Sequence, residues 1–454
     1  MIDLGKEAAQ LSQQPTDERI RGLKRIIPCA TLKAILKKTG LDRRCPRVPN
    51  WFMVWFVIGL GLFHGDCYRQ IFRWLQPYRR WGTPGRSTLC EARKRLGIAP
   101  LRWLYDSVVR LLGTVAASPG AFYRGMRLMG VDGFVTDLPD TPDNARIFGR
   151  PSSGRAPGGF PQARVLALCE LGTHVIWRFL VKPICRGENT MARYLLGFLE
   201  RGMLLLWDRG FLSYDLVAQV SRQGAHLLAR VKTNLIFKDM RRLPDGSYLS
   251  KLYPSPWHRS RDQDGILVRI IEYTFTDPGW PGAGEKHRLL TTLLDWRLDP
   301  AKTLIVLYHE RWEEELTFDE LKTHQRGRPV LKSETPAGVV QEIYGLLLGH
   351  YVVRKLMFEA ATQQGIEPRR LSFTNTLKIL RCRLADSPKS VRGIKKWYAD
   401  LLEEVGEEIL EERRDRINPR VIKRKMSKWP KKRPQHRRCP QPTKKIRESI
   451  QMLC

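Results

Sequence analysis

The pattern of hydrophobic and polar positions divides the chain into a helical first part and a middle part of strands and helices. Residues 20 to about 118 repeat apolar positions at helical spacing, and the run 51–63 is almost entirely apolar. That run is too short to cross a bilayer and contains two glycines, so we predict a helix buried in a folded domain. Thr88 and Glu91 form a capping-box pattern for a later helix, and Gly97 is a stop signal.

From about Arg127 the apolar period changes to that of strands. We predict strands at 127–139, 203–211 and 226–232, a strand pair within 163–184, and helices at 189–202 and 214–224. This alternation indicates a mixed α/β sheet with crossover connections. Residues 234–286 are rich in turn residues around strand-like runs, which predicts a β insertion. A buried strand at 287–295 and a long charged helix follow.

The charge balance points to a polyanionic partner. Lys and Arg number 79 against 46 Asp and Glu, which gives a formal charge of +33. Such an excess destabilises a folded protein by self-repulsion unless a polyanion neutralises it, and nucleic acid is the commonest one. Small basic packing proteins and membrane-surface binders share this charge, but 42% hydrophobic residues and thirteen Trp indicate a folded protein of enzyme size. Between Arg420 and Arg447 there are thirteen Lys or Arg and no acidic residue, which predicts a flexible, phosphate-gripping or solubilising tail.

The nine cysteines are scattered and form no CxxC pair, which argues against a disulfide framework and a structural zinc site. The first twenty residues lack an apolar signal core. We therefore expect a cytoplasmic protein in a reducing compartment, with no membrane partner.

Basic residues occur at two places where DNA docking is one interpretation. The short helix between Thr88 and Gly97 carries three of them, and a solvated helix face fits them equally well. Two more end the strand that enters the insertion, and we predict phosphate contacts there. The first group is Arg93, Lys94 and Arg95, and the second is Arg230 and Lys232.

A single helix is predicted to carry Tyr308, Arg311, Glu315 and Lys322 on one face, because offsets of three, seven and fourteen residues return to that face. A carboxylate, two cations and a phenol in this arrangement can bind a metal ion and grip phosphates. On spacing alone, a solvated charged helix is the better interpretation.

Two aspartates strengthen the metal interpretation. Asp132 and Asp208 each end an apolar strand, where an unpartnered charge is costly. With Glu315 they would supply hard oxygen ligands for two Mg²⁺ ions, which can act on both sides of a phosphodiester. Taken singly, Asp132 could cap a turn and Asp208 could pair with Arg209.

At this point the chain resembles bacterial transposases of the insertion-sequence-four family, in the Asp-Asp-Glu group with a ribonuclease-H-like core. The resemblance covers roughly residues 20–360. It includes "VDGFVTDLPDTPDN", "WDRGFLSY" and the full spacing of Tyr, two residues, Arg, three residues, Glu, six residues and Lys. The combination of the spaced signature with "DRGF" is highly specific.

The resemblance implies roles for these residues. Asp132, Asp208 and Glu315 would be catalytic metal ligands, while Tyr308, Arg311 and Lys322 would contact DNA phosphates. Family members can stack an aromatic residue on a flipped base, at a place that corresponds here to the neighbourhood of His287, with Trp280 before it and Trp296 after it.

The resemblance also implies the architecture: an α/β, ribonuclease-H-like mixed sheet with flanking helices. The expected parts are an N-terminal helical DNA-binding region (1–120), a catalytic core in two pieces (121–232 and 287–360), a β-rich insertion (233–286), a C-terminal helical region (361–418) and a basic, flexible tail (419–454).

The function implied is cut-and-paste transposition with two Mg²⁺ ions, or Mn²⁺, acting on double-stranded DNA at element ends and targets. A homodimer on DNA, association with the nucleoid and the absence of a small-molecule substrate follow from the same resemblance. Three alternatives stay open: a catalytically inactive transposase-derived DNA-binding protein, a structural RNA-associated basic protein, and a recombinase with Tyr308 or a Ser as nucleophile.

Overall fold

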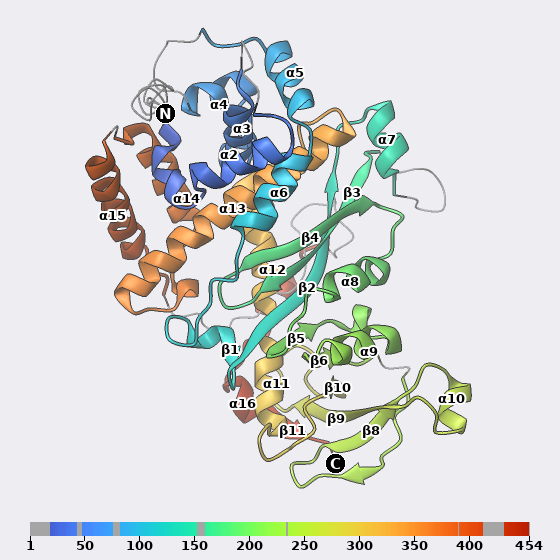
Figure 1. Cartoon of the computed structure of the whole chain (residues 1–454). Coiled ribbons are helices and arrows are strands. Elements are labelled where there is room, and N and C mark those ends of the chain that lie inside the picture. The colour runs from blue at the N-terminus through green and yellow to red at the C-terminus, as the bar shows by residue number, and fades with distance from the viewer. Residues whose placement is uncertain are drawn as a thin grey trace, which may run out of the picture. The chain divides into compact units, whose positions relative to one another are not determined.

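The computed structural model describes residues 19–42, 48–75, 82–151, 159–232, 235–388, 390–411 and 431–453 (Figure 1). The chain divides into two compact units, each assembled from separate stretches. Unit 1 consists of Met1–Phe122, Gly133–Gly187 and Glu313–Leu410, and unit 2 of Tyr123–Asp132, Glu188–Trp312 and Glu411–Cys454. Within the described residues, no helix combines the length and the apolar character that a membrane span requires.

Unit 1 is built around two apolar helices. The predicted buried run forms α3 (Asn50–Leu62), which packs along the 29-residue helix α13 (Pro336–Gln364). The helices approach closely at glycines: a Cβ on Gly61 would lie 2.1 Å from the Gly345 carbonyl oxygen. This contact explains a glycine within the apolar run, because a side chain there would push the helices apart.

Further helices surround this pair in unit 1. They are η1 (Arg19–Arg25), α2 (Cys29–Lys38), α4 (Tyr68–Leu75), α5 (Arg86–Leu96), α6 (Ala99–Val108), α7 (Pro142–Phe148), α14 (Phe373–Arg383) and α15 (Val391–Glu407). Helix α5 begins two residues before Thr88 with Gly85 as its N-cap and no side-chain cap, so the predicted capping box is wrong. Its predicted end is confirmed, because Gly97 is the C-cap with a φ of 66°.

The β part of unit 1 is an antiparallel hairpin. Strands β3 (Gln162–Glu170) and β4 (Val175–Pro183) are the strand pair predicted within 163–184. The last residues of β2 (Met126–Asp137) belong to this unit, and its first residues belong to unit 2. Unit 1 also contains α12 (Trp312–Asp319) from Glu313 onward and the π-helical turn η4 (Glu320–Arg326).

Unit 2 is organised around a mixed sheet. Strands β2, β5 (Met203–Trp207) and β6 (His226–Arg230) are parallel, and β10 (His287–Thr291) runs antiparallel to β6. The strand order continues through β9 (Ile266–Phe275) and β8 (Tyr248–Leu252) to β7 (Arg241–Arg242). Helices of this unit are α8 (Glu188–Leu196), α9 (Tyr214–Arg222), α10 (Pro256–Ser260) and α11 (Ala301–His309). The predicted mixed α/β sheet with helices and a β insertion is therefore confirmed.

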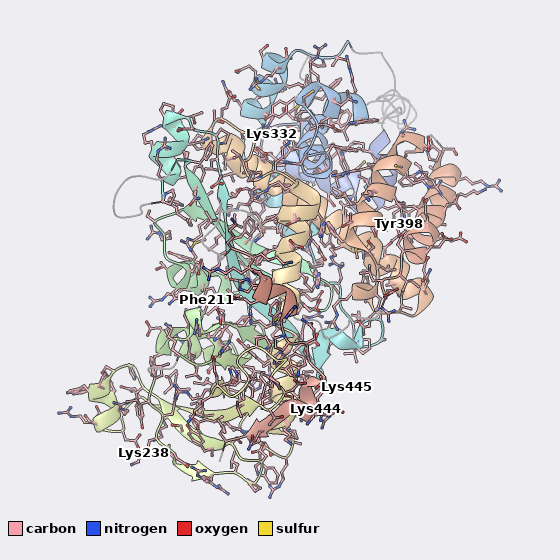
Figure 2. All side chains as sticks on the ribbon, turned by 180° about the vertical axis from the view of Figure 1, so that it is seen from behind. Phe211, Lys238, Lys332, Tyr398, Lys444 and Lys445 are labelled. Atoms are coloured by element: carbon pink, nitrogen blue, oxygen red, sulfur yellow. The ribbon has the colours of Figure 1, made fainter. Side chains whose placement is uncertain are left out.

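The end of the basic tail is folded, which corrects the expectation of a flexible segment. Strand β11 (Ile450–Met452), which follows η7 (Pro434–Arg438) and α16 (Ile446–Ser449), pairs antiparallel with β9. Just before it, the Asp277 carboxylate accepts hydrogen bonds from the backbone N–H groups of Thr443 and Lys444, at 2.7 and 2.8 Å. Lys444 and Lys445 are labelled in Figure 2. Tail residues 412–430 lie outside the described part of the chain.

Candidate functional site

Asp208 directly follows β5, as predicted, whereas the prediction that Asp132 ends its strand is wrong, because the neighbouring parallel strand β2 continues to Asp137. The β2–β5 register pairs Arg127 with Met203 and runs to Gly130 with Leu206. Continued by two residues, it aligns Asp132 with Asp208. Neighbouring strands are about 4.8 Å apart and side chains at one level project to the same face, so this register predicts that the two carboxylates are neighbours.

The turn after β5 shapes the position of Asp208. Its backbone is extended, and its Oδ1 accepts a hydrogen bond of 2.7 Å from the Arg209 N–H. This caps the short turn η3 (Arg209–Phe211), whose buried Phe211 packs near Trp207 with ring centroids 6.4 Å apart. The strand therefore ends where the carboxylate begins, which leaves Asp208 half-buried at the sheet edge.

Arg230 continues the same row of side chains. The β5–β6 register pairs Trp207 with Ala229, so its next step places Arg230 level with Asp208. The Arg230 guanidinium also lies 3.2 Å from Nδ1 of His287 on β10. The predicted place of Arg230 at the end of this strand is confirmed, and the extended register puts it level with Asp208. Lys232 follows it and is half-buried.

Tyr308 supports the same sheet edge from α11. It is 8% exposed, and its hydroxyl donates a hydrogen bond of 3.2 Å to the carbonyl of Trp207, the residue before Asp208. Burial raises the pKa of the phenol, with the charges of Arg311 and Asp208 acting in opposite directions. The phenol is therefore neutral near pH 7, and its hydroxyl proton is donated to the Trp207 carbonyl. Both properties argue against a nucleophilic role. Its phosphate contact stays a prediction.

The predicted single helix from Tyr308 to Lys322 is wrong. Helix α11 ends at His309, α12 begins at Trp312, and the chain changes to a π-helical turn at Glu320. Arg311 thus lies in the break, and Lys322 lies in the π-helical turn, with Nζ 5.7 Å from the centroid of the Phe134 ring. The uninterrupted helix that the spacing assumed is therefore broken between the first and the third signature residue.

Glu315 lies on α12 in unit 1, whereas Asp132 and Asp208 lie in unit 2. Its side chain is half-buried, between the buried Glu314 and the half-buried Leu316. Among the residues that the structure describes, no group of three or more His, Cys, Asp or Glu is arranged to hold a metal ion. Within unit 2, the aspartate pair supplies two oxygen-donor side chains of the kind that Mg²⁺ takes.

The three basic residues of α5 have different environments. We correct the prediction of DNA contact for Arg93, which is 5% exposed and donates to Gln341, Ser333 and the Gly338 carbonyl at 2.9–3.2 Å. Arg95 donates to Asn50 and to the Val48 carbonyl. Lys94 pairs with Glu91, and both Lys94 and Arg95 are exposed to solvent.

The region around His287 offers no free aromatic side chain at the strand start. His287 is 6% exposed, packs on Tyr273 with ring centroids 5.3 Å apart, and its Nε2 lies 2.9 Å from the Gly282 carbonyl. Trp280 is also buried and contacts His309. Trp296 is half-buried, with the Arg297 guanidinium 5.2 Å from its ring centroid.

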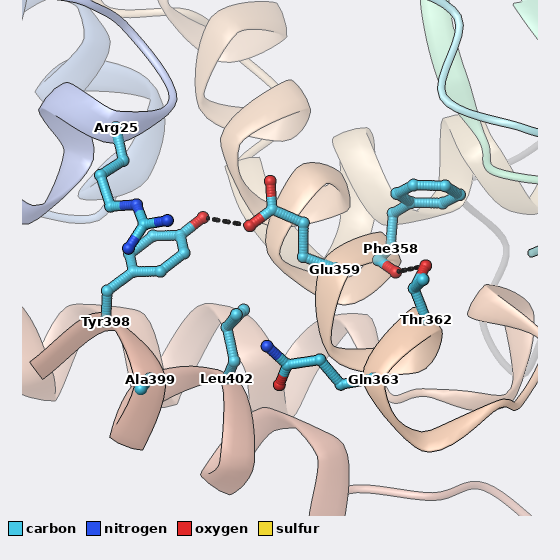
Figure 3. Close-up of a pocket in the computed structure, with 8 residues that line it drawn as sticks. All are labelled: Arg25, Phe358, Glu359, Thr362, Gln363, Tyr398, Ala399 and Leu402. Atoms are coloured by element: carbon cyan, nitrogen blue, oxygen red, sulfur yellow. Dashed lines mark hydrogen bonds between the residues drawn. The ribbon is translucent and has the colours of Figure 1, made fainter. Parts of the chain in front are cut away.

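A cavity of about 260 Å³ lies elsewhere in unit 1, between η1, α13 and α15 (Figure 3). Tyr398 donates a hydrogen bond of 2.8 Å to Glu359 there, and Arg25 covers the tyrosine ring. None of its lining residues carries a predicted role. The sequence also gave no signal for a buried ionic cluster around Glu320, because its partners are far apart along the chain.

Comparison with known proteins identifies the family of the chain. The family model described as "Transposase DDE domain" matches residues 124–351, and the one described as "Insertion element 4 transposase N-terminal" matches residues 17–106. The first covers half of the chain and spans both aspartates and Glu315. The chain belongs to the DDE transposases, enzymes that cleave and transfer DNA, and carries the N-terminal region of the insertion element 4 type.

The chain is also similar to individual transposases. The chain is 29% identical over 397 residues to transposase InsG for insertion sequence element IS4 of Escherichia coli (strain K12), which covers 85% of this chain and 87% of that protein. It is 27% identical over 199 residues to the putative transposase InsZ of the same strain, covering 44% and 64% of the two chains. A solved structure of the piggyBac transposase synaptic complex with hairpin DNA aligns with a TM-score of 0.42 and 12% identity, over 86% of each chain.

Proposed function

We propose that this transposase cuts an insertion element at its terminal inverted repeats and joins the resulting 3′ ends to target DNA. Asp132, Asp208 and Glu315 are the proposed ligands of two divalent ions, Mg²⁺ or Mn²⁺. The observation that supports this best is the β2–β5 register, because its continuation by two residues aligns Asp132 with Asp208. The family match covers all three residues.

The donor set fits a hard divalent cation. Two carboxylates on neighbouring strands about 4.8 Å apart can share an ion and leave positions for water and phosphate oxygens. Glu315 as the third ligand rests on the sequence signature and the family match. When bound, the ions supply Lewis-acid activation of the phosphodiester and stabilise its developing charge.

The chain's own residues bind and orient the DNA strand. Arg230, beside Asp208, offers a guanidinium that can hold a phosphate by two hydrogen bonds. Arg311 is proposed to add a second cation, and the neutral phenol of Tyr308 holds the carbonyl before Asp208 in place. In the proposed reaction, water cuts each element end to leave a 3′-hydroxyl, which then attacks target DNA.

The proposed partner is double-stranded DNA, bound by a homodimer that brings two element ends together. The formal charge of +33 supports this partner, because phosphate neutralisation removes self-repulsion and gives binding that weakens as salt rises. Lys94, which faces solvent on α5, is one residue that can contribute to this binding.

The test is cleavage of a duplex that carries the inverted repeats found beside the gene. Asp208→Asn and Asp132→Asn each remove a ligand charge, and a loss of about 4 kcal/mol in the transition state lowers the rate about 10³-fold. Asp215→Asn is the matched control, because Asp215 is an exposed aspartate on α9 of the same unit. Cleavage by the native chain that is independent of divalent ions, or that survives in the Asp208 variant, would overturn the proposal. DNA binding without cleavage would favour the inactive DNA-binding alternative.

A further inference from the structure

A buried ionic cluster holds both ends of the helix that carries Glu315. The His174 ring lies between two carboxylates, with Nε2 2.7 Å from Glu313 and Nδ1 2.9 Å from Glu320. The second oxygen of Glu320 accepts from Nε2 of His350 at 3.1 Å and from Nε of Arg354 at 2.9 Å. We call these five residues the buried cluster, and all of them lie in unit 1.

The cluster joins three elements of that unit. His174 lies in the turn between β3 and β4, Glu313 and Glu320 bracket α12, and His350 and Arg354 project from α13. All five side chains are in residues no more than 9% exposed. The two ring nitrogens of His174 each contact a carboxylate, and the Arg354 guanidinium also contacts Nδ1, so the ring links the hairpin turn to both ends of α12.

The backbone of His174 is strained in a way that this link explains. Its φ is 58°, in the left-handed region that residues with a side chain rarely adopt. Such a conformation costs roughly 1 kcal/mol or more and persists where the surroundings hold it. Here hydrogen bonds to two carboxylates hold the His174 ring in place. Backbone strain of this kind concentrates in functional regions of proteins.

Burying charged groups costs desolvation free energy even when the groups are paired, so the cluster points to a role beyond stability. Burial alone would raise the pKa of the Glu320 carboxyl, but the charges of Arg354 and His174 hold that pKa well below its ordinary range. Apolar residues of similar volume often stabilise a protein as well as a buried ion pair does, but they do not fix one orientation. Glu320 is also where α12 changes to the π-helical turn, a feature frequent at functional sites.

Helix geometry connects the cluster to Glu315. Glu315 follows Glu313 by two residues, so at about 100° per residue it projects about 160° away around the helix. With Glu313 held against the hairpin turn, Glu315 must point to the opposite side. A carboxylate roughly 5–6 Å from the helix axis moves about 1 Å when the helix rotates by about 10°.

We propose that His174, Glu320 and Arg354 are positioning residues, which fix the rotation of α12 and thereby the direction of the Glu315 carboxylate. This inference rests on the proposed function, in which Glu315 is a metal ligand. The three residues touch neither DNA nor ion. They act through the helix, and a displacement of about 1 Å at a reacting site can cost about 10²-fold in rate.

The experiment compares Glu320→Gln with Leu32→Ala in the full-length chain. Leu32 is a buried residue of α2, and its truncation serves as the control for stability alone. Both are assayed for end-duplex cleavage across a titration of Mn²⁺, at temperatures equally far below their melting points. We expect Glu320→Gln to lower the maximal rate about 10- to 100-fold and to raise the Mn²⁺ concentration for half-maximal cleavage. Binding of the end duplex without divalent ion should be unchanged.

A double-mutant cycle makes the test specific. If the cluster acts as a unit, adding Arg354→Met to Glu320→Gln causes much less further loss than Arg354→Met causes alone. Where Glu320→Gln does not fold, Glu313→Gln tests the same link from the other end of the helix. A cleavage rate and a Mn²⁺ curve equal to those of Leu32→Ala would overturn the inference while leaving the proposed function intact. Failure of the native chain to cleave would instead overturn the proposed function.

Discussion

The crossing of α3 and α13 gives a prediction whose size can be worked out from the structure. A Cβ added at Gly345 would lie 2.1 Å from the Val57 carbonyl oxygen. The closest ordinary carbon–oxygen contact is about 3.3 Å, so Gly345→Ala must separate the two helix backbones by about 1.2 Å. The obstacle is backbone on both sides, so no side chain can move aside to relieve it.

Two terms decide the magnitude. Overpacking in a close-packed core costs about 3 kcal/mol at the upper end of its usual range. Alanine gains about 1 kcal/mol over glycine in a helix interior. The net loss is about 2 kcal/mol, which lowers the melting temperature by roughly 4–8 °C for a unit of this size. Because α13 also carries His350 and Arg354, cleavage should fall as well.

The assay is thermal unfolding of the full chain followed by circular dichroism, with hydrogen exchange on α3 and α13. Gly65→Ala is the matched control, because a Cβ there meets nothing within 4 Å. We expect the control to melt at the native temperature or slightly above it. A Gly345→Ala protein that melts within about 1 °C of the native chain would refute the reasoning, since even 1 kcal/mol should shift the midpoint by more.

Three further predictions concern single side chains. Tyr308→Phe removes the donor to the Trp207 carbonyl, so single-turnover cleavage should fall about 3- to 10-fold. Trapping should detect no covalent protein–DNA adduct with the native protein or with the variant. An adduct with the native protein would contradict this. The backbone N–H groups of Gly279 and Lys444 lower the pKa of Asp277 to about 2. Its contribution to docking of residues 443–453 should therefore be present above about pH 4 and lost as pH falls through about 2, and hydrogen exchange of that segment in Asp277→Asn should be fast at every pH. Arg93→Met should lower the free energy of unfolding in urea by about 2–3 kcal/mol. Lys94→Met should leave that stability unchanged and weaken DNA binding. The reverse pattern would restore Arg93 as a DNA contact.

The sequence predicted most of the sheet because its local signals agree with the fold. The apolar run before Asp208 is a strand that ends there, whereas the run before Asp132 belongs to β2, which continues past the aspartate to Asp137. The break near Arg311 was not predictable in this way, because residues 301–326 contain neither Gly nor Pro. That interruption depends on packing, which local propensity does not report.

Long-range pairing explains the other errors. Arg93 was assigned to DNA because it stands in a basic run, but its partner Gln341 lies 248 residues away on α13. The role of His174 was not predictable for the same reason, since Glu320 is 146 residues further along the chain. Buried polar residues look like surface residues in a sequence until the elements that satisfy them are known.

The close packing of α3 against α13 has a consequence for how the protein can be dissected. Gly61 and Gly345 are 284 residues apart (345 − 61), yet each helix buries the other. A fragment limited to residues 1–120 would carry α3 without its covering helix and would expose an apolar surface that favours aggregation. Tests of the proposed DNA binding by this region should therefore use fragments that retain α13, or the intact polypeptide with its proposed metal ligands substituted.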